Sequence, residues 1–435
     1  MNEPAVVAAG LAWLTQRRGA GVSSTDPVQL FGQLSADAYG DRAWREREAG
    51  YLLGWAAGSA SPAGGFGWRL STGALDPTRG RPLWVGCRMI HCLALGHLLG
   101  HDGDGARVDA GIASLRTEHQ DQEHGGWFAD ADRPGEGRKE AYGHAFVVLA
   151  GASATVAGRP GGRQLLDEAL AVVLERFWDA EALMPFESWD VAFTELEDYR
   201  GGNAAMHLVE AFLAAADATG DAAWRERALA ICERMMSGAR DLGWRVPEHF
   251  DARWRVLPDY NIDEPRHPFR PYGATPGHAF EWARLVLTLR AAHPAPEWFL
   301  EAAVGLVDTA WAEAWDVERG GLAYTTDAHG EPVVRERFHW VTCEAALAAW
   351  ALHRATGEDR WASMYAAAMG FLRDHHVVAE NPGAWWHELS ETNERIALTW
   401  IGSPDAYHAL QAVLLPSLEL APGLAAALAA TRQGQ

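Results

Sequence analysis

The hydrophobic positions of the chain fall into two kinds of helical segment that alternate along the sequence. Segments of the first kind are apolar on nearly all sides, which is typical of helices inside a core. Segments of the second kind, such as DAAWRERALAICERM, carry charge on one face, which is typical of an outer layer. The expected apolar helices begin near Leu83, Glu140, Gly202, Thr275, Phe338 and Asp405. The expected amphipathic helices are Asp41–Trp55, Ala106–His119, Gln164–Trp178, Ala222–Met236, Pro296–Trp315 and Asp359–His375.

Glycine-aromatic motifs punctuate this alternation at intervals of about 60 residues, which indicates a repeat architecture. Examples are GGFGW at Gly64–Trp68, GGW at Gly125–Trp127 and GGLAY at Gly320–Tyr324. Strand signals are confined to short pieces around such motifs. Six hairpins of one outer and one inner helix account for almost the whole chain. Closing them into a ring predicts an all-α (α/α)6 barrel in a single domain, residues 1–435, with a core of about residues 31–416 and short terminal extensions.

One connection breaks the regular spacing. The stretch from Val246 to Tyr272 is too long for a simple turn and too rich in aromatic residues and proline for a flexible linker. Because long ordered loops in compact domains are often lids or binding loops, we expect this connection to serve a site.

Composition narrows the possible partners. The formal net charge of −21 argues against binding to nucleic acid or to an anionic membrane surface. The segment MNEPAVVAAGLAWLTQRR is a poor signal peptide and too short for a membrane span, which favours a cytoplasmic location. The four cysteines form no CxxC pair and lie in expected helices, three of them in apolar ones, so we expect them to be reduced, buried and structural.

Polar side chains recur near the start of each expected inner helix. Inner helices of such a barrel run in one direction, so their first turns meet at one mouth. A polar residue in an otherwise apolar helix is costly unless it is paired or functional, so the sequence predicts a functional site there. The candidates in chain order are Trp84, Arg88 and His91; Tyr142 and His144; Asn203, His207 and Glu210; His278 and Glu281; His339, Trp340 and Glu344; and Tyr407, His408 and Gln411.

The helix that begins near Thr275 carries His278 in its first turn and Glu281 three residues later. Residues three apart share a helical face, so we expect Glu281 to accept a hydrogen bond from the His278 imidazole. Such a partner fixes the tautomer of a histidine that exchanges protons with a substrate. Taken alone, the pair is equally compatible with a core histidine satisfied by a carboxylate.

The residue types at the mouth favour proton transfer. An inverting glycosidase needs two carboxylates facing each other, whereas these positions are mostly histidine. The chain has no nucleotide-binding fingerprint and no HExxH or CxxC pattern, so we expect neither cofactor nor metal. Histidines, an arginine and aromatic walls suit proton abstraction next to a carbonyl of an open-chain aldose. Return of the proton to C1 gives a ketose and return to the other face of C2 gives an epimer, and spacing alone leaves both open.

Five motifs carry a family resemblance: LWVGCRMIH, YRGGNAAMHLVEAF, FRPYGATPGHAFEWARL, WWHELSETNE and PDAYHALQ. In this order they resemble the N-acylglucosamine 2-epimerase superfamily of (α/α)6 barrels, and within it the branch of aldose–ketose isomerases. The resemblance covers roughly residues 31–416. It implies a metal-independent sugar isomerase that interconverts D-mannose and D-fructose through a cis-enediol(ate), with D-lyxose and D-xylulose as a second pair.

The resemblance also implies roles for individual residues. His408 is expected to move the proton between C1 and C2, while His278, oriented by Glu281, opens the sugar ring. Arg88 is expected to stabilise the enediolate oxygen. The expected substrate-contacting residues are His207, Asn203, Trp84, Tyr142, His144, Trp340, Trp386 and His387.

The identity of residue 387 bears on the substrate. A histidine here fits the mannose-isomerising members better than the sulfoquinovose-isomerising ones, for which we would expect glutamine. The alternatives are a mannose 2-epimerase, a sulfoquinovose isomerase, a glycoside hydrolase and a non-catalytic sugar-binding barrel. We expect a monosaccharide as the binding partner, and the oligomeric state stays open.

Overall fold

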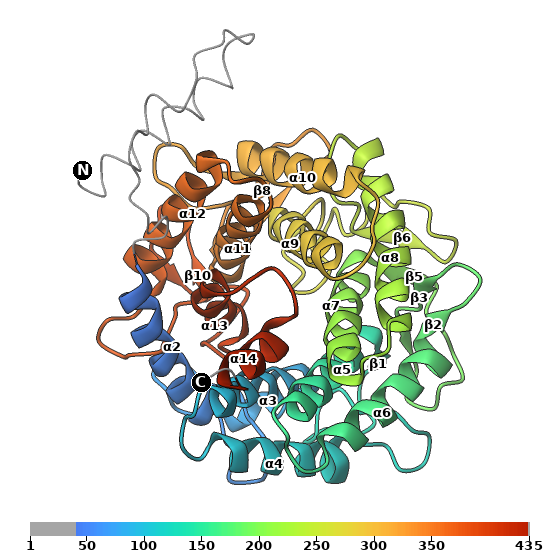
Figure 1. The fold of residues 1–435 in the computed structure, drawn as a ribbon. Helices are drawn as coiled ribbons and strands as arrows, with labels where there is room; N and C mark the ends of the chain where they lie inside the picture. Colours follow the sequence, from blue (N-terminus) through green and yellow to red (C-terminus); the bar gives the residue numbers. More distant parts are fainter. Residues whose placement is uncertain (1–40, 434–435) are drawn as a thin grey trace, which may run out of the picture.

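The computed structural model describes residues 41–433, so the N-terminal segment and residues 31–40 of the expected core lie outside the described residues. Within this range the helices form two concentric rings, which Figure 1 shows end-on. The inner ring consists of α3 (Leu83–Leu98), α5 (Ala141–Val156), α7 (Gly202–Thr219), α9 (Pro276–Ala292), α11 (His339–Thr356) and α13 (Tyr407–Leu414). The outer ring consists of α2 (Arg42–Ala57), α4 (Asp104–Ser114), α6 (Gly162–Val172), α8 (Ala223–Asp241), α10 (Trp298–Ala314) and α12 (Asp359–Phe371).

Each inner helix contacts the next along the chain, and α13 contacts α3, which closes the ring. The burial pattern explains the two layers. Every residue of α5 from Ala141 to Ala154 is buried, whereas α8 buries a single stripe that includes Trp224, Ala228 and Ile231. The predicted all-α (α/α)6 barrel is confirmed.

The inner helices begin within two residues of the expected positions. Pro276 occupies the first turn of α9, where its missing N–H costs no hydrogen bond. Gly220 and Gly357 end α7 and α11 in the left-handed conformation that glycine adopts without strain. Three outer helices run on into a single π-helical turn: Leu115–His119 after α4, Val173–Phe177 after α6 and Leu372–His376 after α12.

The strands within residues 41–433 are two or three residues long and join loops, as expected. They are β1 (Lys139–Glu140) with β4 (Ser188–Trp189), β2 (Trp178–Asp179) with β3 (Met184–Pro185), β5 (Tyr199–Gly201) with β6 (His249–Asp251), β7 (Thr325–Thr326) with β8 (Pro332–Val334), and β10 (Glu388–Leu389) between β9 (Arg337–Phe338) and β11 (Arg395–Ile396). Because β1, β5 and β9 directly precede inner helices, these pairings bring loop residues to the mouth of the barrel.

The opposite end of the barrel is covered by the C-terminal helix α14 (Leu424–Gln433), which packs against α3, α5 and α7 and buries Leu424 and Leu428. All four cysteines are buried and unpaired, as expected. From residue 41 to residue 433, no helix has the combination of length and apolar character that crossing a bilayer requires.

Candidate active site

A pocket opens at the mouth where the inner helices begin. All six inner helices, or the residues directly before them, contribute to its lining within the described chain. The lining residues are Trp84, Arg88, Tyr142, Asn203, His207, Pro268, Phe269, Pro271, His278, Glu281, Tyr324, Phe338, His339, Trp340, His387, Trp400, Pro404, Asp405 and His408. The positive ends of the helix dipoles therefore converge on this pocket, which favours negative charge there.

The residues predicted to act on or contact the substrate line this pocket, except His144 and Trp386. Of the further candidates at the mouth, His339 lines the pocket, whereas Glu210, Glu344, Tyr407 and Gln411 do not. His144 is buried behind the wall, where its Nδ1 donates to the Glu140 carbonyl at 2.7 Å and its Nε2 accepts from the Trp127 amide at 3.1 Å. The Trp386 indole donates instead to the Ile396 carbonyl at 2.8 Å. Placing these two side chains in the pocket was wrong: His144 holds the loop of Trp127 against α5, and Trp386 is bonded within the connection between α12 and α13.

His91 also lies away from the pocket. Its Nδ1 is 2.7 Å from the Ser153 hydroxyl, and the residue lines a second cavity beneath α14. Two helical turns separate it from the start of α3, which places it too deep to reach the mouth.

His408, on α13, is held by a glutamate from the neighbouring inner helix. Its Nδ1 donates to Glu344 Oε1 at 2.8 Å, so Nε2 carries the free lone pair. Burial lowers the pKa of His408, and the Glu344 carboxylate opposes this effect only in part. His408 is therefore a neutral histidine with one free basic nitrogen, as a general base requires.

His278 is held in the same way, but by a different residue from the one expected. Its Nδ1 lies 2.9 Å and 3.0 Å from the two oxygens of Glu248, which also accepts the Thr275 amide at 3.1 Å. The predicted hydrogen bond to Glu281 was wrong. Glu248 directly precedes β6, and the pairing of β6 with β5 brings it to the mouth.

Trp340 lies against both histidines. The centroid of its ring is 5.3 Å from that of His278 and 5.6 Å from that of His408, with both imidazoles tilted over the indole. This contact fixes the two ring orientations relative to each other, so that one bound sugar can meet both.

Arg88 supplies a fixed positive charge at the pocket. Its guanidinium donates to Asp405 at 3.0 Å and to the Tyr142 hydroxyl at 3.1 Å, and it lies 5.0 Å from the centre of the Trp84 ring. The ion pair with Asp405 and the aromatic packing hold the planar group in one orientation. A preorganised guanidinium of this kind stabilises negative charge that develops on a substrate oxygen.

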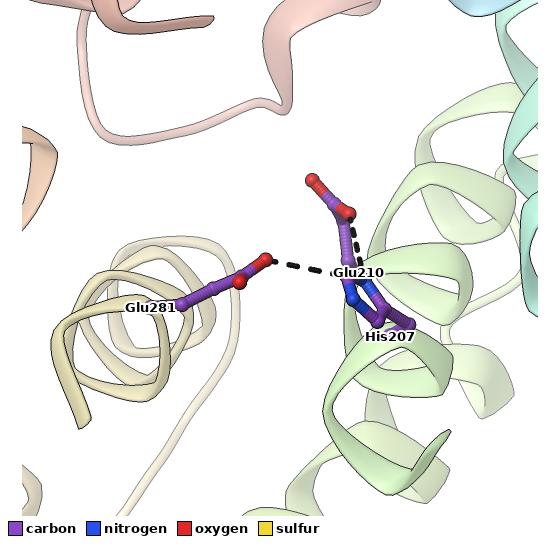
Figure 2. A group of neighbouring side chains, drawn as sticks. All are labelled: His207, Glu210 and Glu281. Atoms are coloured by element: carbon purple, nitrogen blue, oxygen red, sulfur yellow. Dashed lines mark ion pairs between the residues drawn. The ribbon is translucent and has the colours of Figure 1, made fainter. Parts of the chain in front are cut away.

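The floor of the pocket is a group of buried acids and histidine (Figure 2). Glu281 points from α9 toward α7, where its Oε1 lies 3.9 Å from His207 Nδ1, and Glu210 Oε2 lies 3.8 Å from the same nitrogen. Burial, reinforced by the nearby Glu344 carboxylate, raises the pKa of Glu281 well above its ordinary value. Burial lowers the pKa of His207 to about 4. Burial thus favours the protonated form of Glu281 and the neutral form of His207.

Two sets of side chains on the floor have the spacing of metal ligands. They are His207 with Glu210 and Glu281, and Glu281 with Glu344 and His408. The guanidinium of Arg284 already donates to Glu344 at 3.0 Å and to Glu281 at 3.3 Å. A divalent cation at either set would have to share these carboxylates with a buried permanent cation, so the donor sets are a poor fit to a metal.

His339 and His387 form a further polar wall. The His339 amide donates to the His387 carbonyl at 3.0 Å, and the two rings stack with centroids 3.9 Å apart. Neither ring nitrogen of His339 has a protein partner within the described part of the chain. Because a buried imidazole without a partner is costly, these nitrogens are suited to hydroxyl groups of a ligand.

The long connection before α9 forms one edge of the pocket, as expected of a binding loop. Pro268, Phe269 and Pro271 line the pocket, and the Phe269 ring lies 5.4 Å from Trp400 and 6.3 Å from Trp84. Arg270 fastens this edge by donating to both oxygens of Glu197, at 2.6 Å and 3.0 Å.

Sequence reasoning missed Glu248, Asp405 and Arg284 as parts of the site. Glu248 stands in the motif VPEHF, and Asp405 stands in PDAYH, three residues before His408. The signal for both was a carboxylate next to a glycine-aromatic or histidine motif. Arg284 lies two turns into an apolar helix, where a charged residue demands a partner.

The structure is a barrel of helical hairpins. Two histidines held by glutamates and a fixed arginine lie at one mouth. This arrangement is typical of proteins that transfer protons on a small polar ligand. Comparison with known families agrees with this class. The model of the N-acylglucosamine 2-epimerase (GlcNAc 2-epimerase) family matches residues 64–412, and the chain belongs to this family.

Individual relatives within this family are similar to the chain over most of their length. The chain is 48% identical over 397 residues to a D-mannose isomerase from Thermobifida fusca, covering 89% of this chain and 97% of that one. It is 46% identical to a D-mannose isomerase from Pseudomonas cannabina pv. alisalensis, over 89% of this chain and 95% of that one. A crystal structure of a D-mannose isomerase superposes with a TM-score of 0.82 at 28% identity, covering 88% of this chain and 99% of that one.

Proposed function

We propose that the protein is a D-mannose isomerase that interconverts D-mannose and D-fructose. The observation that carries the proposal is the pair His278 and His408, each held at Nδ1 by a glutamate and each lining the same pocket. The high identity to two D-mannose isomerases over nearly their full length supports the same activity and the monosaccharide substrate.

In the proposed mechanism His278 exchanges protons with the sugar oxygens. It first opens the pyranose ring by moving a proton from the anomeric hydroxyl to the ring oxygen. His408 Nε2 then removes the proton from C2 of the open-chain aldehyde, and the electrons move to the carbonyl oxygen to give a cis-enediolate. Return of a proton from His408 to C1, with transfer of a proton from O2 to O1, completes the ketose.

Charge stabilisation comes from the surroundings of the pocket. Arg88 and the converging helix N-termini favour the enediolate oxygen, because they are fixed before the charge develops. His207, Asn203, Trp84, Tyr142, Trp340 and His387 are proposed to bind the sugar, and His339 is added to them.

Among the alternatives, a 2-epimerase needs the same histidines and differs only in where the proton returns. A hydrolase needs two free carboxyl groups across the bond. At this mouth Glu248 is committed to His278 and Asp405 to Arg88, which leaves Glu281, within the described residues, as a single pocket-lining carboxyl group with an unbonded oxygen. A non-catalytic barrel has no need of two pocket histidines that are each held at Nδ1 and leave the other nitrogen free.

The proposal includes a single catalytic domain that works without metal or other cofactor. Arg284 among the floor carboxylates supports the metal-free mechanism. We also propose a cytoplasmic location, with which four unpaired, buried cysteines are compatible.

The test is product identification by ion chromatography after incubation with D-mannose, D-fructose, D-lyxose or D-glucose, before and after dialysis against EDTA. The proposal expects D-mannose to yield D-fructose, and EDTA to leave the rate unchanged. D-glucose as the first product of D-mannose would make the protein a 2-epimerase, and a rate restored only by added metal would overturn the metal-free mechanism.

A further inference from the structure

We propose that Arg284 is a positioning residue beneath the pocket floor. It joins the pair of His408 and Glu344 to the group of His207, Glu210 and Glu281. The inference rests on the proposed function, in which His408 is the base. Arg284 itself is absent from the pocket lining, so it acts on the substrate only through its neighbours.

The contacts of Arg284 span three inner helices. Its Nε donates to Glu344 Oε2 at 3.0 Å, on the carboxylate whose other oxygen holds His408. Its Nη2 donates to Glu281 Oε1 at 3.3 Å, and its Nη1 lies 3.9 Å from Glu210 Oε1. The guanidinium side chain is only 5% exposed, so these interactions are little screened by water. One planar cation therefore fixes the carboxylates of α7, α9 and α11 relative to one another.

A charge count shows why this cation matters. Glu210, Glu281 and Glu344 would carry three negative charges in a buried space that holds one guanidinium. Burial would raise the pKa of Glu344, but Arg284 and His408 outweigh this and lower it. Burial raises the pKa of Glu281, and the Glu344 carboxylate raises it further. Arg284 thus favours the ionised form of Glu344, the partner of His408, while burial and the Glu344 carboxylate favour the protonated form of Glu281.

Other titratable groups also face the carboxylates of Glu210, Glu281 and Glu344 and affect their pKa values. Glu210 accepts a hydrogen bond from the Tyr407 hydroxyl and one from Gln411 at 3.3 Å. The remaining charged or titratable groups around it are Arg88 and His91 on α3, Tyr142 on α5 and His207 on α7. Arg284 is the cation that makes direct contact with the carboxylates of the cluster within the described residues.

A cavity at the end of the barrel opposite the sugar pocket extends to Arg284. Arg284 lines the second cavity, beneath α14, together with His91, Glu210 and Gln411. A guanidinium ion in solution can therefore take the place of a truncated side chain without crossing the sugar pocket.

The experiment compares Arg284→Met and Arg284→Lys with Arg45→Met, a matched control whose buried arginine pairs with Asp41 on the outer ring. Removal of a buried positive charge raises the proton affinity of every group around it. We expect Arg284→Met to lower kcat by about 100-fold or more, to change KM little and to move the acidic limb of the kcat/KM profile to higher pH.

Arg284→Lys should keep the limb nearer its original pH, because the charge is retained while the forked geometry is lost. Guanidinium ion should restore Arg284→Ala and leave Arg45→Ala unaffected.

A second readout needs no substrate. In ring-proton NMR of the histidines, the pKa of His408 should rise in Arg284→Met and stay unchanged in Arg45→Met. Kinetics are measured on whichever sugar the wild-type protein converts, so failure of the wild type with D-mannose counts against the proposed function alone. An unchanged His408 titration, or Arg284 variants as active as the control, would overturn the role of Arg284. If Arg284→Met does not fold, the kcat of Arg284→Lys, which should fall because the forked geometry is lost, and guanidinium rescue of Arg284→Ala decide the question.

Discussion

His278 and His408 are organised by one local rule, because in each ring Nδ1 is committed to a glutamate from another element and Nε2 is left for the pocket. The glutamate fixes the tautomer, and burial keeps His408 neutral. The proposed chemistry therefore depends on two histidine–glutamate pairs whose members are far apart in the sequence and adjacent in the fold.

Replacement of the proposed base tests the rule directly. His408→Asn preserves a polar side chain of similar size but cannot take a proton at the substrate. A positioned acid–base group contributes about 100- to 10,000-fold, so we expect kcat/KM to fall within that range. The exposed His329 on the turn between β7 and β8 provides the control His329→Asn, which should keep full activity. An active His408→Asn with the same thermal midpoint as the wild type would remove His408 from the mechanism.

The pH profile reports on the partner of the base. Because burial lowers the pKa of His408, protonation inactivates the base only below the ordinary histidine value of about 6.5, so kcat/KM should be near its plateau at that pH. The Glu344 carboxylate raises the proton affinity of the ring, so Glu344→Gln should move the acidic limb to still lower pH and reduce the plateau. Glu318→Gln, on an exposed loop, should change neither. An acidic limb that moves upward in Glu344→Gln would contradict the assignment.

At the scale of elements, the mouth is built by short strands and one long loop. β5 and β6 pair over three residues, and this pairing brings Glu248 to His278. The connection before α9 then returns along the pocket, and the bidentate bond from Arg270 to Glu197 fastens it next to Phe269. Arg270 also lies over the Tyr199 ring at 4.1 Å, so two elements hold the loop at one residue.

Loss of this fastening should weaken binding more than chemistry. Arg270→Ala removes both hydrogen bonds and the ring contact, so the loop must be ordered when the sugar binds. Ordering costs of about 0.5–1.5 kcal/mol per side chain correspond to a rise in KM of about 2- to 10-fold, with little change in kcat. Arg255→Ala, at an exposed position of the same loop, is the control. Steady-state kinetics that show a fall in kcat at unchanged KM would place Arg270 in the chemistry instead.

At the scale of the molecule, the barrel could be predicted because its signal is local. Apolar and amphipathic helices alternate along the chain, and a ring of six such hairpins buries every apolar helix inside. The direction of the inner helices then placed most of the site residues at one mouth before any contact was known.

The partners of those residues could not be predicted in the same way. Glu248 and His278 are 30 positions apart, and Arg284 and Glu344 are 60 apart, so neither pair has a helical spacing. The expected pair His278 and Glu281 failed because three residues leave an offset of about 60° around a helix. That offset lets one side chain turn toward the loop at the mouth and the other toward the barrel axis. The position of His144 was predicted wrongly for a related reason. Its Nε2 accepts a hydrogen bond from the Trp127 amide, which only the folded loop brings near.

The most direct test of the whole account is proton NMR of the protein with D-mannose in D2O, followed over time. Proton transfer between C2 and C1 by a histidine predicts that D-fructose forms first, with deuterium entering at C1 as the base exchanges with solvent. D-mannose recovered from the reverse reaction should then carry deuterium at C2. D-glucose with deuterium at C2 before any D-fructose, or no conversion of D-mannose at all, would contradict the account.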